Sequence, residues 1–271
     1  MSTLARSRTG VEAQPPTGGW QSVAAHWLRK YRRVWLGTAI TSVLSPLLFL
    51  AGMGFGLGML VDRAAGGIGG VPYVVFIAPG VLAMTTLQVA AGETTFSVMG
   101  AIKWQPIYVG MLATPLRVRD LVVGHLAYVL VRVTIAAVVF VGVAAALGTI
   151  RSPWGLVAIP VAVLGGMAFA SCCYAYSASL TNDQGLVLMF RFVVMPMSLF
   201  SGTFFPIEQL PGWLQPLAWV TPLWHTVDAS RSLVLGTATP GPVLGHVVYL
   251  VCWLVVGYVL SVRVLSRRMV L

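Results

Sequence analysis

Six long apolar segments constrain this chain more than any other feature of its sequence. They cover approximately residues 36–60, 72–98, 121–147, 154–180, 186–204 and 243–265. Each is close to, or longer than, the roughly 20 residues that a helix needs to cross a bilayer. The sequence therefore predicts an all-α integral membrane protein with six transmembrane helices.

The composition excludes a soluble catalytic domain. Of 271 residues, 58% are hydrophobic and only 9% are charged, whereas about a quarter of a typical soluble domain is charged. The net charge of +10 could suggest nucleic acid, but the basic residues stand in short loops beside apolar segments, as the positive-inside rule describes. We therefore expect membrane lipids, and no nucleic acid, among the partners.

The distribution of Lys and Arg predicts the orientation. Most of them lie in the N-terminal region, the 100–120 loop and the C-terminus: Arg6, Arg8, Arg29, Lys30, Arg32, Arg33, Lys103, Arg117, Arg119, Arg263, Arg267 and Arg268. The opposite face would carry only Arg63, Arg151 and Arg231. Since basic loops stay in the cytoplasm, we expect a multi-pass protein of a bacterial-type plasma membrane with both termini cytoplasmic.

The N-terminal region divides into two parts. Residues 1–19 are polar and rich in Pro and Gly, which predicts a disordered cytoplasmic tail. Over residues 20–33, apolar side chains recur at helical spacing and cations cluster apart from them. This pattern predicts an interfacial amphipathic helix on the inner leaflet, and a merely basic tail is the alternative.

Prolines interrupt the apolar stretch from Ser201 to Gly236. Each proline removes a backbone donor and disrupts a helix, and four occur here: Pro206, Pro211, Pro216 and Pro222. The tryptophans of this stretch suit the boundary between hydrocarbon and water: Trp213, Trp219 and Trp224. We therefore expect an outer re-entrant helical hairpin at about 204–236, which also contains Arg231. A seventh span here would place the basic C-terminus outside.

The loop KWQPIYVGMLATPLRVRD, residues 103–120, is the most informative piece expected in the cytoplasm. Pro106 suits the first turn of a helix and Pro115 suits its end. The apolar residues between them predict a short amphipathic helix: Ile107, Tyr108, Met111 and Leu112. Such a helix fits a groove on a soluble partner, and a loop that lies on the membrane is the alternative.

These motifs resemble those of a known family. The runs SGTFFP, LPGWLQ and TPLWH, together with Ala113-Thr114-Pro115, are similar to ABC type-2 exporter permeases, particularly those of drug and lipooligosaccharide exporters. The resemblance implies that residues 34–271 form a six-span ABC type-2 transmembrane domain. It also implies a coupling helix at about 103–115 that touches the ATP-binding subunit through six residues: Ile107, Tyr108, Met111, Leu112, Thr114 and Pro115.

The energy source is expected outside this chain. Its two lysines, Lys30 and Lys103, do not end a G-x-x-x-x-G-K-[ST] run that cradles phosphates. We therefore expect that this chain is not an enzyme by itself and that it binds no cofactor. ATP and Mg would be bound by a separate subunit. The resemblance implies two copies of that ATP-binding subunit and a second permease, identical or homologous.

Three ionisable residues are candidate intramembrane charges: Glu93, Arg132 and Arg191. A charge at mid-membrane costs about 2.5–3.5 kcal/mol on insertion scales. Arg132 lies deepest by counting, and Glu93 is its candidate partner. Three roles remain open for these residues: a structural ion pair, gating or cargo contact, and snorkelling to the interface.

Other motifs permit two interpretations each. Phe200, Phe204 and Phe205 form a polarisable surface that suits apolar cargo, with packing or lipid contact as the alternative. Four glycines of the first span give two overlaid G-x-x-x-G spacings, for a dimer seam or for packing within the bundle: Gly52, Gly54, Gly56 and Gly58.

His225 and Asp228 share one helical face. Two ligands do not complete a zinc site, and the cysteines, Cys172, Cys173 and Cys252, lie in apolar segments as small hydrophobic groups. We therefore predict a satisfied interfacial pair of His225 and Asp228, with Arg231 as a candidate third member, and no catalytic or metal site.

Together, these features predict the permease subunit of an ATP-driven ABC exporter. Its cargo would be an amphiphilic, lipidic or drug-like molecule, with a glycolipid among the candidates, moved out of the cytoplasm or the inner leaflet. The alternatives are a gradient-driven transporter or channel subunit and an intramembrane enzyme.

Overall fold

The computed structural model describes residues 18–269, apart from the side chains of residues 38–43, 46 and 55. Almost all of the tail expected over residues 1–19 lies outside this range. The regular elements of the described part are helices, and Ile68 and Val71 form an isolated β-bridge.

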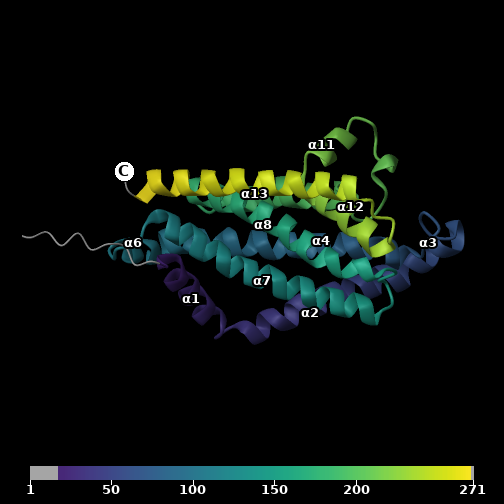
Figure 1. Ribbon diagram of the computed structural model, residues 1–271, viewed down its shortest axis with the longest axis horizontal. Coiled ribbons are helices and arrows are strands. Elements are labelled where there is room, and N and C mark those ends of the chain that lie inside the picture. Colours follow the sequence, from purple (N-terminus) through teal and green to yellow (C-terminus); the bar gives the residue numbers. More distant parts are fainter. Residues whose placement is uncertain (1–17, 270–271) are drawn as a thin grey trace, which may run out of the picture.

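Long helices packed side by side make up the protein (Figure 1). The first half contains α1 (Gly19–Tyr31), α2 (Trp35–Ala51), π-helical η1 (Gly52–Leu57), α3 (Gly58–Ala65), α4 (Tyr73–Thr94), α5 (Phe96–Met99), π-helical η2 (Gly100–Trp104), α6 (Ile107–Leu112) and α7 (Val118–Ala146). The second half contains 3-10 helix η3 (Pro153–Val157), α8 (Ala158–Ser179), α9 (Gln184–Met189), π-helical η4 (Phe190–Val194), α10 (Met195–Phe200), 3-10 helix η5 (Ile207–Gln209), α11 (Gln215–Trp219), α12 (Pro222–Leu235) and α13 (Pro240–Met269).

Within the described range, five helices are long and apolar enough to cross a membrane: Leu47–Ala65, Tyr73–Trp104, Val118–Ala146, Pro153–Ser179 and Pro240–Met269. The segment expected over 186–204 is a shorter apolar helix, Gln184–Phe200, built from α9, η4 and α10. At about 1.5 Å per residue it is about 25 Å long, slightly less than the roughly 30 Å hydrocarbon core. The structure thus shows an all-helical protein with five long candidate spans and one shorter apolar helix.

Helix α8 lies at the centre of the bundle and packs against α4, α7, α12 and α13. Glycines bring two of these helices close: Gly165 faces Thr226 of α12, and Gly257 of α13 faces Ser171. A Cβ atom at either glycine would come within 3.0 Å of its neighbour. Such small residues allow the close helix approach that is typical of membrane bundles.

Helix α1 covers most of the interfacial helix expected over 20–33 and packs against α7. Its Val23 and Trp27 are buried, and Gly124 of α7 leaves room for its backbone. Arg29 and Lys30 in its last turn are exposed. The apolar face of α1 therefore contacts the bundle, whereas Arg29 is exposed and Lys30 Nζ lies 5.0 Å from the centre of the Trp27 ring.

The glycines of the first span divide into two faces. Gly54 and Gly58 face α4, where added side chains would meet neighbouring atoms. A Cβ atom at Gly52 or Gly56 would meet nothing within 4 Å. One G-x-x-x-G face thus packs within the chain, and the other is open.

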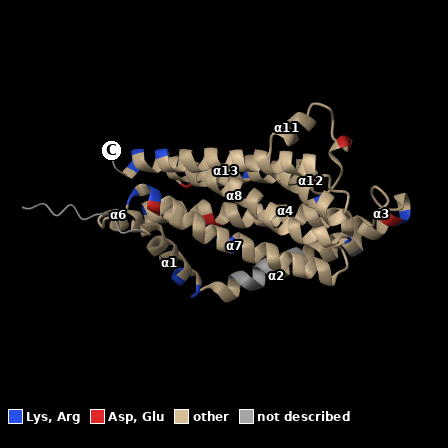
Figure 2. Ribbon diagram, in the orientation of Figure 1, with Lys and Arg blue, Asp and Glu red and all other residues tan. Residues whose placement is uncertain are grey.

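The two ends of the bundle differ in charge (Figure 2). Helix α1, helix α6 and the C-terminus lie at one end, whereas α3 and the 201–222 segment lie toward the other (Figure 1). Basic residues occupy the last turns of both α1 and α13 at the first end. We call it the basic end.

Candidate functional site

The expected coupling helix is helix α6 at the basic end. Pro106, which has no N–H to donate, directly precedes the helix. After its last residue, the Thr114 hydroxyl donates to the carbonyl of Met111 at 2.5 Å. Pro115 follows, and the residue before a proline disfavours helix. The two prolines thus bracket a six-residue helix that stands between the long helices ending in η2 and beginning with α7.

The two faces of α6 have different surroundings. Tyr108 is fully buried, whereas Ile107, Met111 and Leu112 are half-buried against the core. Thr114 and Pro115 are exposed, together with Gly110 and Val109, whose side chain is 54% exposed. Apolar periodicity could not single out Val109, because it lies off the apolar stripe. The accessible surface of this segment therefore includes Val109, Gly110, Ala113, Thr114 and Pro115, while Tyr108 anchors the helix.

A chain of hydrogen bonds holds the buried Tyr108. The Tyr174 hydroxyl of α8 donates to the Tyr108 hydroxyl at 3.0 Å. Tyr108 in turn lies 2.6 Å from Nδ1 of His125, whose Nε2 lies 2.9 Å from the carbonyl of Glu93. A carbonyl only accepts, so His125 carries its proton on Nε2 and accepts from Tyr108 on Nδ1. Burial raises the pKa of Tyr108 well above its ordinary value, which keeps this donor protonated.

The structure brings Glu93 and Arg132 together as an ion pair. Arg132 Nε donates to Glu93 Oε1 at 3.0 Å, and the side chains are only 6% and 19% exposed. The Tyr128 hydroxyl donates to the other carboxylate oxygen at 2.9 Å. The Arg132 guanidinium also lies 4.2 Å from the centre of the Tyr31 ring. Arg191, in contrast, lies exposed on η4.

These groups form one connected unit, which we call the polar network: Glu93, Tyr108, His125, Tyr128, Arg132 and Tyr174. Trp27 of α1 covers it, stacked on Tyr128 with 5.9 Å between the ring centres and 4.4 Å from His125. The polar network therefore joins α4, α6, α7 and α8 and is closed by α1. A movement of α6 that carries Tyr108 along has to alter its hydrogen bonds to α7 and α8, and His125 connects these to α4.

Two cations hold the end of α8 beside this network. Arg268 Nη1 donates to the carbonyls of Ala178 and Leu180 at 2.8 and 2.6 Å. Lys103 Nζ donates to the carbonyl of Thr181 at 3.1 Å. The carbonyls at a helix C-terminus have no intrahelical partner and attract positive charge. The last residues of α13 and of η2 are thus fixed to the same helix end.

The stretch 201–236 forms helices α11 and α12, which are preceded by the short helix η5. Pro206 precedes η5, and Pro222 begins α12, whose first turn is capped by the Thr221 hydroxyl accepting from Trp224 N at 3.3 Å. A small core holds the first limb together: Ile207, Leu210 and Ala218 with Phe200, Phe205, Leu214 and Trp224. Pro211 and Trp213 are exposed at the tip, Trp213 at 77%.

Arg231 of α12 binds carbonyl oxygens instead of a carboxylate. Its Nη2 donates to Gly202 at 2.6 Å, its Nε donates to the Phe76 carbonyl at 3.3 Å, and its guanidinium lies 4.0 Å from the Phe76 ring. Burial lowers the pKa of Arg231 to about 10, so it stays charged at neutral pH. Arg231 therefore ties α12 to α4 and to the turn after α10.

His225 and Asp228, which were predicted as a pair, are linked through a residue that the sequence did not nominate. His246 of α13 stands between them, with 2.8 Å between the two Nδ1 atoms and 3.1 Å from His246 Nε2 to Asp228 Oδ2. His225 Nε2 lies 2.9 Å from the Trp219 carbonyl. Sequence could not show this link, because α13 is a separate helix. Among the described residues, no group of three His, Cys, Asp or Glu is placed to hold a metal ion.

The three candidate cargo-facing phenylalanines divide between two environments, and Phe205 belongs to both. Phe200 packs in the core of the first hairpin limb. Phe204 and Phe205 line a cavity of about 600 Å³ shared with η1 and α3, where Met53 and Leu57 lie. Phe204 also contacts Phe49 of α2, with 5.7 Å between the ring centres.

Comparison with known proteins identifies the family of this chain. Residues 19–235 match the family model described as ABC-2 type transporter. The chain is 32% identical over 257 residues to nodulation protein J of Rhizobium meliloti (strain 1021), a match that covers 94% of this chain and 96% of that protein. It is 34% identical over 267 residues to nodulation protein J of Rhizobium leguminosarum bv. trifolii, covering 97% and 99%.

A more distant relative carries a transport description. The chain is 24% identical over 251 residues to the inner membrane transport permease YadH of Escherichia coli (strain K12), covering 86% of this chain and 94% of that protein. Permeases of this kind are multi-pass membrane subunits that pair with separate ATP-binding subunits. The chain therefore belongs to the ABC-2 type transporter family, as an export permease subunit without an ATPase domain of its own.

Proposed function

We propose that this permease moves an amphiphilic molecule, lipidic or drug-like and with a glycolipid among the candidates, out of the cytoplasm or the inner leaflet. The observation that carries the proposal is the exposed face of α6, whose buried Tyr108 belongs to the polar network. ATP-driven movement of a partner against this face would be passed to four helices. Two ATP-binding subunits and a second permease, identical or homologous, would complete the exporter.

The proposed topology has six spans, with α9, η4 and α10 together as the fifth. With an even number of spans, α1, α6 and the C-terminus share one side, as the basic end suggests. The positive-inside rule then assigns that side to the cytoplasm. The segment 204–236 would form a re-entrant hairpin at the outer face, with α12 inserted against α4 and α8.

Coupling would work between two global states. Closure of the ATP-binding subunits would press on Val109, Gly110, Thr114 and Pro115, with Met111 and Leu112 at the margin of the contact. Tyr108 would transfer the displacement to His125 and Tyr174. A site on α6 and a cargo path between permeases, linked through two states, meet the definition of allostery.

The proposed cargo path lies along the first span and the hairpin. The cavity between η1, α3 and the 204–209 segment exposes Phe204 and Phe205 beside Met53. Aromatic and methionine side chains accept varied apolar ligands. A second permease facing this side would close the path.

A charge on the exposed face of α6 tests the coupling role. We expect Val109→Asp to reduce cargo-dependent ATP hydrolysis at least about tenfold, because burying an unpaired charge in an interface costs more than the 1.4 kcal/mol that a factor of ten represents. The measurement is ATP hydrolysis by the purified complex in nanodiscs. The matched control is Asn182→Asp, which adds a carboxylate to an exposed loop. Hydrolysis equal to wild type in Val109→Asp would refute the coupling role of this face.

The partner requirement has a test of its own. After gentle solubilisation from the native membrane, a P-loop ATPase should copurify in stoichiometric amount. Its reproducible absence from folded permease would favour a gradient-driven transporter or channel.

A further inference from the structure

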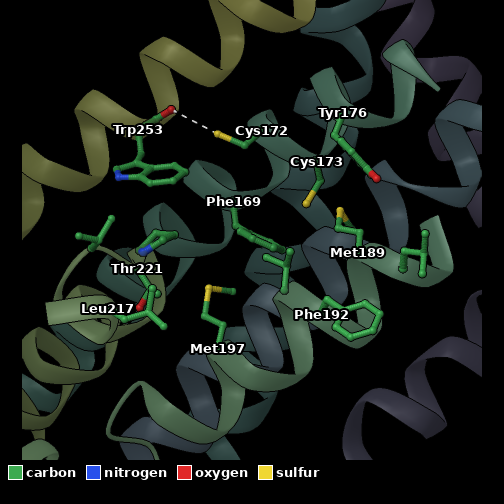
Figure 3. Close-up of a pocket in the computed structure, with 14 residues that line it drawn as sticks. Phe169, Cys172, Cys173, Tyr176, Met189, Phe192, Met197, Leu217, Thr221 and Trp253 are labelled. Atoms are coloured by element: carbon green, nitrogen blue, oxygen red, sulfur yellow. Dashed lines mark hydrogen bonds between the residues drawn. The ribbon is translucent and has the colours of Figure 1, made fainter. Parts of the chain in front are cut away.

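A deep apolar cavity lies between α8, the helix formed by α9, η4 and α10, and α13 (Figure 3). Its volume is about 690 Å³, and the turn between α11 and α12 covers one end. Its floor consists of side chains that are at most 7% exposed: Phe169, Cys173, Met189 and Met197. Its rim consists of exposed residues: Phe192, Leu217 and Val220. The cavity is thus closed at the back and opens sideways.

The cavity lies at the depth of the hydrocarbon core. Trp253, which lines it, stands near the middle of α13 (Pro240–Met269). At about 1.5 Å per residue, this position is about 20 Å from one end of the helix and about 24 Å from the other. A bilayer has a hydrocarbon core about 30 Å thick, so a residue at mid-helix faces acyl chains.

The walls offer few hydrogen-bonding groups to a polar ligand, and the two hydroxyls among them already donate within the protein. The Thr221 hydroxyl donates to the Ala218 carbonyl at 2.7 Å and accepts from Trp224 N. The Tyr176 hydroxyl donates to the Gly185 carbonyl at 3.1 Å. No charged side chain is among the residues that line the cavity. Buried water needs two to four polar partners, so hydrocarbon is the complementary filling.

We infer that this cavity binds one acyl chain of a membrane phospholipid, taken sideways from the bilayer. The bilayer presents such chains to the rim continuously, and an empty cavity would lose the dispersion contacts of its lining. Met189 and Met197 in the floor suit a chain of variable conformation, since methionine adapts to irregular shapes. The phospholipid headgroup stays at the membrane surface, because no charged side chain lines the cavity to bind it.

The bound acyl chain holds two groups of helices of the permease apart. It contacts η4 on one side and both α13 and the turn between α11 and α12 on the other. If α9, η4 and α10 closed onto α13, the acyl chain would have to leave the cavity. A ligand that binds one conformation stabilises that conformation by mass action, so long-chain lipid favours the open arrangement seen here.

Photolabelling tests the inference. The full chain, with its copurifying partners, is placed in phosphatidylcholine nanodiscs that contain a phosphatidylcholine with a diazirine at the end of one acyl chain. After irradiation, mass spectrometry should find adducts on the peptides around Phe169–Cys173 and Met189–Met197. Adduct yield there should saturate as the fraction of probe rises, whereas yield on the exposed face of α13 at Val255 and Val256 should rise linearly.

A pair of Cys→Trp variants supplies the control. Cys173→Trp places an indole in the floor and should reduce labelling of both floor peptides several-fold. Cys252→Trp adds the same group to an exposed position of α13 and should leave this labelling unchanged. If Cys173→Trp fails to fold, the saturation curve of the wild type still decides. Floor labelling that rises linearly, or floor residues crosslinked to a second copy of the chain, would overturn the assignment to a phospholipid.

Discussion

At the scale of single residues, Tyr108 is the point at which the surface of α6 meets the interior. Its hydroxyl accepts from Tyr174 and donates to His125, so one oxygen joins α6, α7 and α8. Among residues 18–269, neither neighbour has a second hydrogen-bond partner for the atom that it offers to Tyr108. The polar network therefore depends on this single hydroxyl for its link to the surface.

Removing that hydroxyl should uncouple ATP hydrolysis from the binding of cargo to the permease. Tyr108→Phe leaves a buried His125 acceptor and a buried Tyr174 donor unpaired, at about 1–3 kcal/mol for each group left unsatisfied. We expect cargo-stimulated ATP hydrolysis to fall toward the basal rate and the melting temperature to fall by several degrees. Tyr176→Phe is the matched control, because the Tyr176 side chain is 38% exposed and its hydroxyl donates to the Gly185 carbonyl of α9, outside the polar network. Stimulation as in wild type would show that the hydroxyl transmits nothing.

The ion pair of Glu93 and Arg132 should behave as a coupled pair. Glu93→Gln leaves the Arg132 charge buried without its carboxylate, and breaking a buried pair in this way costs about 3–5 kcal/mol. The double variant with Arg132→Met removes both charges and should recover a large part of this loss. The interaction energy between the two side chains is obtained from the thermal unfolding, in one detergent, of the wild type, the two single variants and the double variant. If the effects of the two single substitutions on stability add up strictly to that of the double variant, the pair does not stabilise the fold.

At the scale of elements, the positions of the prolines allowed the local structure to be predicted from the sequence. Pro106 and Pro115 predicted the short helix that α6 forms, and the prolines of residues 206–222 predicted short helices in place of one straight span. Proline acts through its own backbone, so its effect does not depend on the rest of the fold. The sequence named Glu93 as a candidate partner of Arg132, but whether their depths match depends on how α4 and α7 pack, which the structure shows.

Features that depend on contacts between helices were not predictable. Apolar spacing placed Tyr108 with Ile107 and Met111, but its inward position depends on His125 and Tyr174 from other helices. The π-helical segments η1, η2 and η4 differ from α-helix by one hydrogen-bond step, and composition gives no signal for that step. His246 joins His225 to Asp228 only because α13 packs beside α12.

The first span makes an element-scale prediction about its two glycine faces. Gly54→Leu should lower stability by about 1–3 kcal/mol, the usual cost of overpacking, because a Cβ atom there would lie 2.9 Å from Val74. Gly56→Leu meets open space in the single chain. It should leave the melting temperature unchanged and weaken the association of two permeases, which native mass spectrometry measures. Equal effects of the two variants on association would contradict separate roles.

At the scale of the whole molecule, α4 links the two candidate sites. One end of α4 supplies Glu93 to the polar network, and the other supplies the Phe76 carbonyl to Arg231. A helix is stiff along its axis because its hydrogen bonds run parallel to that axis. Displacement at α6 can therefore reach the hairpin through α4 without any change in the helices between them.

This transmission requires that α6 and the hairpin lie on opposite sides of the membrane, which cysteine labelling can decide. In a chain whose three cysteines are replaced by alanine, Trp213→Cys should react with an impermeant maleimide in intact cells, since Trp213 is 77% exposed at the hairpin tip. Asn182→Cys, in the exposed loop after α8, should react only after permeabilisation. Labelling of both in intact cells would rule out the six-span topology. Labelling of Asn182→Cys alone would invert the orientation, leaving the basic end outside against the positive-inside rule.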